Sequence, residues 1–314
     1  MTNKQKYEIF CKTESVPIFL QYWWLNTVCG NDNWDVAIVE KNNKIIASMP
    51  YFKTKKMMFN MIFMPKLTQF MGPFLIYPKG QKYERKLSYE KEILTILIEQ
   101  LPNYDFFYQN FHYSITNWLP FYWKGFKQTT RYTYIIEDTS NLELIFSNFR
   151  SNIKTDIKKA QKKVKIEKSL DIGSFYEINK MTFERQNMKI PYTFDFLESI
   201  HKECLSHNCS KLYLAKDKDN IIHAAIYVIW DKTTMYYLLS GGNPKYRNSG
   251  ATSLLIWEAI KDASKMGLKF DFEGSMIEPI ERFFRAFGAK QVPYFQITKA
   301  KNKILHILYQ LIKE

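Results

Sequence analysis

Residues 236–288 read YYLLSGGNPKYRNSGATSLLIWEAIKDASKMGLKFDFEGSMIEPIERFFRAFG. The stretch begins with an apolar run that predicts a strand and ends in Ser-Gly-Gly at 240–242. A loop of small and polar residues follows, and from Ala251 an apolar pattern predicts a long helix. A second strand is predicted at 269–273, directly before Gly274. Strand, loop, helix and strand in this order predict an α/β unit with an anion site where the loop enters the helix.

Four residues of the loop are the candidate ligands of this anion site: Arg247, Ser249, Gly250 and Ala251. The backbone N–H groups of such a loop and of the helix N-terminus point at a bound anion. Gly250 and Ala251 carry little or no side chain, so the backbone can approach the anion closely. We expect this site to hold the phosphate groups of an acyl donor.

The segment resembles the core of the GNAT acyltransferases, whose loop pattern is Arg/Gln-x-x-Gly-x-Gly/Ala. Arg247 and Gly250 match this pattern, Ala251 follows, and Thr252 stands at the last position. The ending, FDFEGSM (270–276) and ERFFRAFGAKQVPYFQITK (281–299), resembles the Fem-type aminoacyltransferase and BioF2-like (CelD-like) acetyltransferase family. The resemblance implies an α/β fold, an α+β mixed sheet, in which two GNAT-like units are fused in tandem.

The two halves of the chain repeat one pattern, which supports two copies of the unit. WDVAIVEKNNKIIASMPY (34–51) and KLYLAKDKDNIIHAAIYVIW (211–230) each predict a hairpin. A helix and a strand then follow at 89–107 and again at 253–273. We predict a first unit at 1–145, with a degenerate donor loop and a role in acceptor binding. The second unit, 146–314, contains a basic junction helix and the acyl-donor site.

The basic junction helix is predicted at 148–168. One helical stripe is apolar and consists of Ile153, Ile157, Ala160 and Val164. Lys154 and Lys158 belong to the neighbouring basic face. Fem-type proteins carry a similar basic helix at this junction, which implies that these lysines contact an anionic substrate. A solvated surface is the alternative for each single lysine.

Two carboxylates lie on the second strand. Asp271 and Glu273 are two residues apart, which places both on one face of a strand. Acyl transfer to an amine needs a base, or a water relay, to take the ammonium proton. Glu273 is the candidate base, with a structural role as an equal alternative. For Asp271 we expect a structural role, as an acceptor for loop N–H groups.

The first strand supplies further candidates through the resemblance. In the GNAT fold this strand splays from its neighbour, and the pantetheine arm of the donor enters the gap. A backbone N–H there polarises the thioester carbonyl, a role that the resemblance places on Leu239, Ser240 and Gly241. Tyr237 is the candidate acid that reprotonates the thiolate. Of Tyr236 and Tyr237, one should face the site and the other the core, and core packing is the alternative for either.

Four residues are candidates for substrate binding. Arg185 and Tyr192 lie in a stretch that resembles the acceptor-proximal part of the second Fem-type unit. Arg282 and Arg285 are predicted on the helix after the second strand, where an arginine binds a donor or acceptor phosphate. A surface ion pair is the alternative for Arg282 and Arg285.

Composition sets outer limits on function. The chain has 314 residues, 46% of them hydrophobic, and a net charge of +14, which favours a folded core and an anionic partner. Its four cysteines form no dense framework, and neither an apolar signal core nor a membrane span is present. We therefore expect a cytoplasmic protein. The basic amphipathic segment 299–314 is expected to pack against the body of the protein, with peripheral contact to the anionic inner membrane face as the alternative. No metal is expected, because no standard ligand spacing occurs.

The resemblance implies transfer of an acyl group from acetyl-CoA, or another acyl-CoA, to an amine. The acceptor would be a small-molecule or lipid-linked anionic precursor of the cell envelope or of a polysaccharide. The alternative donor is aminoacyl-tRNA, in a Fem-type transfer to a peptidoglycan precursor, where the positive charge would help to hold tRNA phosphates. The non-enzymatic alternative is a binding module that kept the fold and lost turnover.

Overall fold

The computed structural model describes residues 1–56 and 58–302, and these divide into two compact units. The first unit consists of residues 1–131 and 293–302, and the second of residues 132–292. These ranges differ from the predicted 1–145 and 146–314, because the chain changes units within β6 (Lys127–Ile136) and again within β12 (Lys290–Ala300). The apolar residues of the predicted C-terminal amphipathic segment lie outside the described residues.

The first unit is built on one mixed sheet. Its strands are β1 (Trp34–Lys41), β2 (Lys44–Lys56), β3 (Phe59–Phe63), β5 (Phe106–Asn110) and the end of β12, in that order, while β4 (Phe74–Leu75) pairs with β2. The predicted hairpin is formed by β1 and β2, whose turn residues Asn42 and Asn43 have φ of 52° and 60°. Asparagine tolerates this left-handed backbone, which a two-residue hairpin turn requires.

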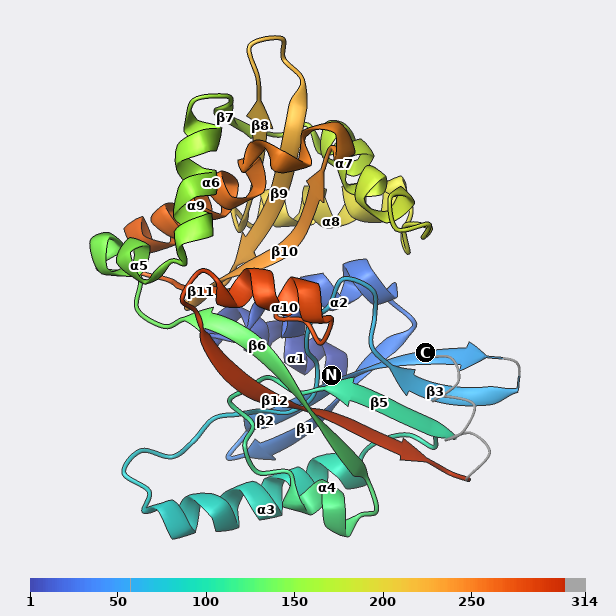
Figure 1. Ribbon diagram of the computed structural model, residues 1–314. Coiled ribbons are helices and arrows are strands. Elements are labelled where there is room, and N and C mark those ends of the chain that lie inside the picture. The colour runs from blue at the N-terminus through green and yellow to red at the C-terminus, as the bar shows by residue number, and fades with distance from the viewer. Residues whose placement is uncertain (57, 303–314) are drawn as a thin grey trace. The chain divides into compact units, whose positions relative to one another are not determined.

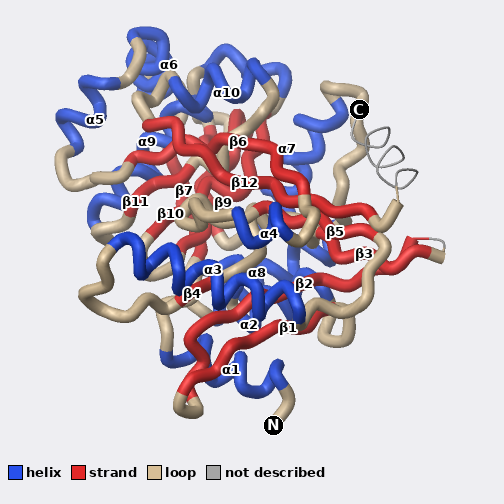
Figure 2. The backbone as a smooth tube through the Cα atoms, turned by 90° about the horizontal axis from the view of Figure 1, so that it is seen from below, coloured by secondary structure: helices blue, strands red, loops and turns tan. Residues whose placement is uncertain are grey.

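Helices flank the strands of the first unit. They are α1 (Asn3–Thr13), the 3₁₀ helix η1 (Ile18–Leu20), α2 (Tyr22–Cys29), α3 (Tyr83–Glu99) and α4 (Leu119–Trp123). Figure 2 shows α3 beside α4, near β1 and β2. The core of this unit includes Met49, Leu97, Phe107 and Ile297. Ile297 comes from β12, so the end of the chain helps to complete the first core.

The second unit has its own mixed sheet. From the end of β6 the order is β11 (Lys269–Asp271), β10 (Thr234–Gly242), β9 (Ile222–Trp230), β8 (Ser210–Lys216) and β7 (Lys165–Ser169). β10 and β11 are parallel, and the other described pairs in this unit are antiparallel. The helices are α5 (Leu142–Asn148), α6 (Ser151–Gln161), α7 (Ile172–Glu184), α8 (Phe194–Ser206), η2 (Pro244–Ser249), α9 (Ala251–Lys265) and α10 (Glu278–Arg285).

Alternate residues of β9 separate the helices of the second unit into two layers. Ile226 and Val228 belong to a core cluster with α6 and α9, which lie side by side in Figure 1. Tyr227, between them, contacts Phe175 of α7 and His201 of α8. A strand points successive side chains to opposite faces, so α6 and α9 cover one face and α7 and α8 the other.

The predicted junction helix at 148–168 is wrong in its length. The chain forms α5, then α6, and at Lys165–Ser169 it becomes strand β7, which pairs with β8. The apolar stripe itself is confirmed, since Ile153, Ile157, Ala160 and Val164 are all buried. The helix ends early because β7 supplies hydrogen-bonding partners to β8, which would otherwise be the edge of the sheet.

The predicted strand at 269–273 is also too long. β11 ends at Asp271, and Glu273 and Gly274 have φ of 58° and 63°. A Cβ on Gly274 would collide with the carbonyl of Tyr132, so the chain turns tightly against β6 at this point. Glu273 therefore does not continue the strand alternation that would have placed it on the same face as Asp271.

Candidate active site

Strand β10 runs past the end of β11, which opens the sheet on one side. β10 pairs with β11 only at Thr234, Met235 and Tyr236, whereas it pairs with β9 as far as Gly242. A β-bulge lies between Tyr237 and Leu239, and such a bulge bends the strand that carries it. Beyond Tyr236, no described strand pairs with the edge of β10 that faces away from β9. This confirms the predicted splay between the two strands.

The backbone groups of Ser240 and Gly242 face this open edge. The carbonyl of Ser240 accepts a hydrogen bond from Asn179 Nδ2 (2.6 Å), and the Gly242 N–H donates to Thr182 Oγ1 (3.0 Å). In an antiparallel strand the N–H and C=O of one residue point to the same side, and the side alternates along the chain. The N–H of Ser240 therefore faces the opening, while those of Leu239 and Gly241 face β9.

A cavity of about 510 Å³ lies in the second unit beside this edge. That volume falls in the range typical of small-molecule sites. Its wall combines polar residues of α7 and the η2–α9 loop with apolar residues of α10. The lining residues include Asp156, Thr182, Arg185, His223, Tyr237, Ser240, Gly241, Gly242, Tyr246, Arg247, Ser249, Gly250, Ala251, Ile280 and Phe284.

The structure brings the predicted anion loop to the cavity wall. Arg247, Ser249, Gly250 and Ala251 all line it. α9 begins there without a side-chain cap, and the Ala251 N–H contacts Ser249 Oγ at 3.3 Å. The first N–H groups of a helix lack partners within the helix. Together with the Arg247 guanidinium they make this end of the cavity suited to an anion.

The glycines have a packing role that the sequence alone did not reveal. A Cβ on Gly250 would collide with the carbonyl of Asp156 in α6, and Gly250 has a φ of 78°. A Cβ on Gly241 would lie 2.5 Å from the backbone nitrogen of Asn179 in α7. Gly250 and Gly241 thus let α6 and α7 pack closely on the loop and on β10. Around Gly242 no atom lies within 4 Å of an added Cβ among the described residues.

Tyr236 and Tyr237 have different surroundings. Tyr237 lines the cavity, and its ring packs on Phe284 with 5.8 Å between centroids. Tyr236 is buried, and its hydroxyl donates to Asp231 Oδ2 at 3.0 Å. Burial raises the pKa of Tyr237 well above its ordinary value, and a nearby Ser240 lowers it only in part. The Tyr237 phenol therefore stays protonated at neutral pH, as an acid must.

The two carboxylates at the end of β11 differ in environment. Asp271 is buried and accepts hydrogen bonds from the Thr133 hydroxyl and from the Glu273 N–H, the latter at 2.7 Å. Burial raises the pKa of Asp271 to about 6. Burial, and then the charge of Asp271, raises the pKa of Glu273 well above its ordinary range. Glu273 is not among the residues that line the cavity, so a role as base stays a prediction and requires a water relay.

Arg185 at the end of α7 lines the cavity, but the other predicted substrate ligands lie elsewhere. Tyr192 is buried and donates to Asn179 Oδ1 (2.5 Å), so it orients the amide that holds Ser240. Arg285 forms an ion pair with Glu281 at 2.8 Å, and Arg282 is exposed on the same helix.

Lys154 and Lys158 lie on α6, each two residues from the cavity-lining Asp156. Two residues along a helix are about 200° apart. Both lysines therefore point away from the cavity, and Lys154 Nζ donates to the Ser147 carbonyl at 2.6 Å.

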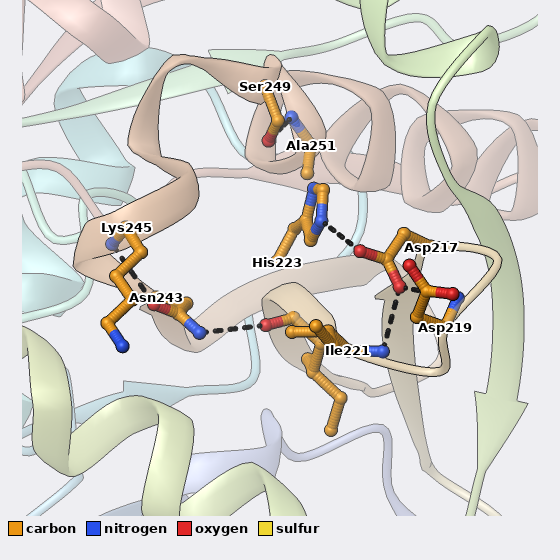
Figure 3. A network of polar contacts seen from close by, with 9 residues as sticks. Asp217, Asp219, Ile221, His223, Asn243, Lys245, Ser249 and Ala251 are labelled. Atoms are coloured by element: carbon orange, nitrogen blue, oxygen red, sulfur yellow. Dashed lines mark hydrogen bonds and ion pairs between the residues drawn. The ribbon is translucent and has the colours of Figure 1, made fainter.

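Sequence reasoning missed His223. Its Nε2 lies 3.1 Å from Asp217 Oδ2, as Figure 3 shows, and its ring stacks on Tyr246 at the cavity wall. The signal was present: residues 217 and 223 flank the turn of a predicted hairpin, where cross-strand neighbours meet. The sequence position of a single histidine on a strand, however, does not predict which side chains of the turn contact it.

Two features are absent from the described part of the chain. Residues 1–56 and 58–302 contain no group of three or more His, Cys, Asp or Glu side chains placed to hold a metal ion. None of the helices formed by these residues is both long and apolar enough to cross a bilayer.

Comparisons with known proteins agree with this geometry. Residues 147–283 match the family of acetyltransferase (GNAT) domains. The crystal structure of FemX superposes with a TM-score of 0.68 at 13% identity, covering 100% of this chain and 99% of FemX. The C-terminal domain of a putative lysylphosphatidylglycerol synthetase from Agrobacterium fabrum gives 0.61 at 10% identity, over 98% and 95% of the two chains.

A tandem GNAT protein from the clavulanic acid biosynthesis pathway gives a TM-score of 0.50 at 6% identity, over 95% of this chain and 94% of that one. Among curated protein sequences, none matches the chain. The predicted fold class, α/β with two GNAT-like units, is confirmed by the GNAT match and by this tandem likeness. The second unit thus contains a segment that matches acetyltransferase (GNAT) domains, and the fold of the chain is similar to that of FemX and of a tandem GNAT protein.

Proposed function

We propose that the chain transfers an acyl group from acyl-CoA to an amine of a cell-envelope or polysaccharide precursor. The observation that carries this proposal is the cavity at the splayed edge of β10. It combines an anion-binding end at Arg247 and the start of α9 with a backbone N–H at Ser240. A pyrophosphate at the first and a thioester carbonyl at the second would suit a CoA ester laid along the strand.

The residues divide the chemical work as follows. The Ser240 N–H stabilises the oxyanion that forms when the amine attacks the thioester carbonyl. Tyr237, kept protonated by burial, donates its proton to the departing thiolate. Glu273, in its ionised form and reached through water, accepts the proton that the attacking amine loses. The apolar side of the cavity, including Ile280 and Phe284, shields the thioester from bulk water.

Aminoacyl-tRNA is the second candidate donor. The likeness to FemX over the whole chain favours it, as does a neighbour whose name states the synthesis of lysylphosphatidylglycerol. Exposed lysines on α6, with Lys158 among them, offer contacts for tRNA phosphates. We rank acyl-CoA first because the anion loop lines the cavity, whereas Lys154 and Lys158 point away from it.

The test is release of free thiol from acetyl-CoA with a panel of amines. We expect turnover by the wild type with at least one anionic amine acceptor. Arg247→Gln should raise the KM for acetyl-CoA about tenfold, because a charge-assisted hydrogen bond to phosphate is lost. Arg282→Gln, an exposed arginine outside the cavity, is the matched control and should leave the KM unchanged. Equal effects of the two variants would contradict the proposed donor site.

A further inference from the structure

The cavity wall carries a buried histidine with a carboxylate behind it. His223 is 5% exposed, and its ring stacks on Tyr246 with 4.0 Å between centroids. Asp217 binds its Nε2, as Figure 3 shows. Its Nδ1 is buried, and no hydrogen-bond partner for it is found among the described residues. A buried polar atom without a partner costs free energy, so this nitrogen is a candidate for hydrogen bonding to a ligand.

Asp217 is fixed by the hairpin turn itself. Its Oδ1 accepts hydrogen bonds from the N–H groups of Ile221 (2.9 Å) and Asp219 (3.0 Å). Burial raises the pKa of Asp217, but the Ile221 N–H and the His223 imidazole lower it more, so that it lies below its usual range. The ionised carboxylate holds the Nε2–H of His223, which leaves Nδ1 as the nitrogen available to a ligand.

The distance of His223 from Ser240 limits the roles that its imidazole can have in the reaction. Asn243 donates its N–H to the His223 carbonyl, three residues beyond Ser240 along β10. At 3.3 Å per residue this is roughly 10 Å from the backbone N–H proposed for the thioester. His223 is therefore too far along the strand to take a proton from an attacking amine, and it lies at the end of the cavity that Arg247 and Ser249 also line.

The charges around this end favour an anion. Two arginines, Arg185 from α7 and Arg247 from η2, line the same cavity, with Asp156 from α6 as the acidic side chain in its wall. Asp217 faces the other side of the imidazole, and Tyr246 covers its ring. An imidazolium between Asp217 and a bound phosphate would have an acceptor at each nitrogen, which satisfies both N–H groups.

We propose that His223, held by Asp217, binds a phosphate group in this cavity and takes up a proton when the phosphate binds. When a pyrophosphate ester binds, the imidazole takes one proton from solvent at Nδ1 and donates it in a hydrogen bond to a phosphate oxygen. The Nε2–H stays on Asp217, and no covalent bond to the ligand changes. Because Nδ1 is buried, binding includes a local movement of the side chains that cover it. The choice of CoA as the pyrophosphate ester rests on the proposed function.

The proton uptake has a defined sign. The complex holds one more proton than the free protein, so affinity rises as pH falls. The phosphate monoester of CoA also titrates, with a second pKa near 6. A comparison of variants with the same ligand removes that contribution, because it is common to all of them.

Calorimetric titration in two buffers of different ionisation enthalpy measures the proton uptake directly. The probes are CoA and inorganic pyrophosphate, each with the wild type, His223→Gln and Asp217→Asn. His201→Gln is the matched control, because His201 is also a buried histidine of the second unit, yet it does not line the cavity. Asparagine at 217 retains the acceptor oxygen for the turn N–H groups.

We expect proton uptake by the wild type and by His201→Gln, and less by Asp217→Asn. His223→Gln should bind about tenfold more weakly and take up no extra proton, since a charge-assisted hydrogen bond is lost. Binding of pyrophosphate but not CoA, with proton uptake, would retain this site and contradict the proposed donor. Equal proton uptake by wild type and His223→Gln would overturn the inference and leave the proposed function standing. Failure of both probes to bind the wild type would overturn both.

Discussion

Asp271 shows how a single buried carboxylate connects the end of β11 to its surroundings. It accepts hydrogen bonds from the Thr133 hydroxyl on β6 and from the Glu273 N–H in the turn. Its sequence position suggested this structural role, because a carboxylate at a strand end is a ready acceptor for loop N–H groups. The tight turn that follows was not predictable, since the positive φ of Glu273 depends on the approach of the backbone to β6.

The raised pKa of Asp271 makes stability depend on pH in a defined direction. Burial raises this pKa to about 6, above the value of about 3.9 for an unfolded chain. The folded state then holds more protons than the unfolded state between these values, so the free energy of unfolding falls as pH rises through them. Asp271→Asn keeps the acceptor oxygen and removes the charge. We expect it to increase the free energy of unfolding at pH 7 by up to about 3 kcal/mol and to flatten this part of the pH profile.

Urea unfolding of both proteins across the pH series measures the effect. At acidic pH the two proteins should have similar stability, because Asp271 is protonated in both states of the wild type. A variant that is less stable than the wild type at neutral pH would show that the ionised carboxylate stabilises the fold.

Glu273 is the predicted base, although its side chain lies outside the cavity wall. It does not line the cavity, so a proton from the amine would reach it through water. We expect Glu273→Gln to lower turnover about a hundredfold while CoA affinity is retained, because general base catalysis is typically worth that much. Steady-state kinetics and CoA titration of the variant provide the measurement. Turnover near that of the wild type would make Glu273 a structural residue.

At the scale of elements, β10 determines where a ligand can enter. The resemblance to the GNAT fold predicted its splay from β11, and the structure places the bulge between Tyr237 and Leu239. The sequence could not show that Gly241 faces α7 while Gly242 faces open space, because this depends on where a helix from another part of the chain packs. The same limit hid His223, whose partner Asp217 reaches it only through the folded hairpin.

The two neighbouring glycines provide a matched test of this packing. Gly241→Ala places a Cβ 2.5 Å from the Asn179 backbone nitrogen, so we expect a loss of about 1–3 kcal/mol in the free energy of unfolding. Gly242→Ala meets no described atom within 4 Å and should unfold within about 0.5 kcal/mol of the wild type. Chemical denaturation compares the two variants. Similar stability of Gly241→Ala and Gly242→Ala would mean that α7 does not pack closely on β10 at Gly241.

At the scale of the whole molecule, the repeat in the sequence predicted two α/β units, and the tandem GNAT fold confirms it. The repeat did not predict the residue ranges of the two units. The last strand, β12, resembles its counterpart β6 in pattern, yet its end pairs with β5 of the first unit. Apolar alternation predicts that a strand exists, but the choice of a distant partner depends on packing over the complete chain.

Surface charge distinguishes the two candidate donors, acyl-CoA and aminoacyl-tRNA, because tRNA would contact a wide surface of the protein. Neutralising Lys154, Lys158 and Lys162 to Gln removes three positive charges from α6 and its C-terminal end. If tRNA binds there, affinity should fall and the slope of log affinity against log salt should flatten by about one unit per lost phosphate contact. We expect neither change for CoA, because the lysines point away from the cavity. A salt series with tRNA and CoA measures both ligands, and weakened CoA binding would contradict the placement of the donor.

The central claim is that the cavity of the second unit holds the CoA donor, and the most direct test is a calorimetric titration of CoA into the wild type and Gly242→Leu. Gly242 lines the cavity and an added Cβ meets no described atom within 4 Å, so a leucine side chain has room to project from the strand and reduce the space for a ligand. We predict that the wild type binds CoA with one-to-one stoichiometry and that a folded Gly242→Leu protein binds it at least tenfold more weakly. Equal affinity in the two proteins, or no binding of CoA by the wild type, would contradict the claim.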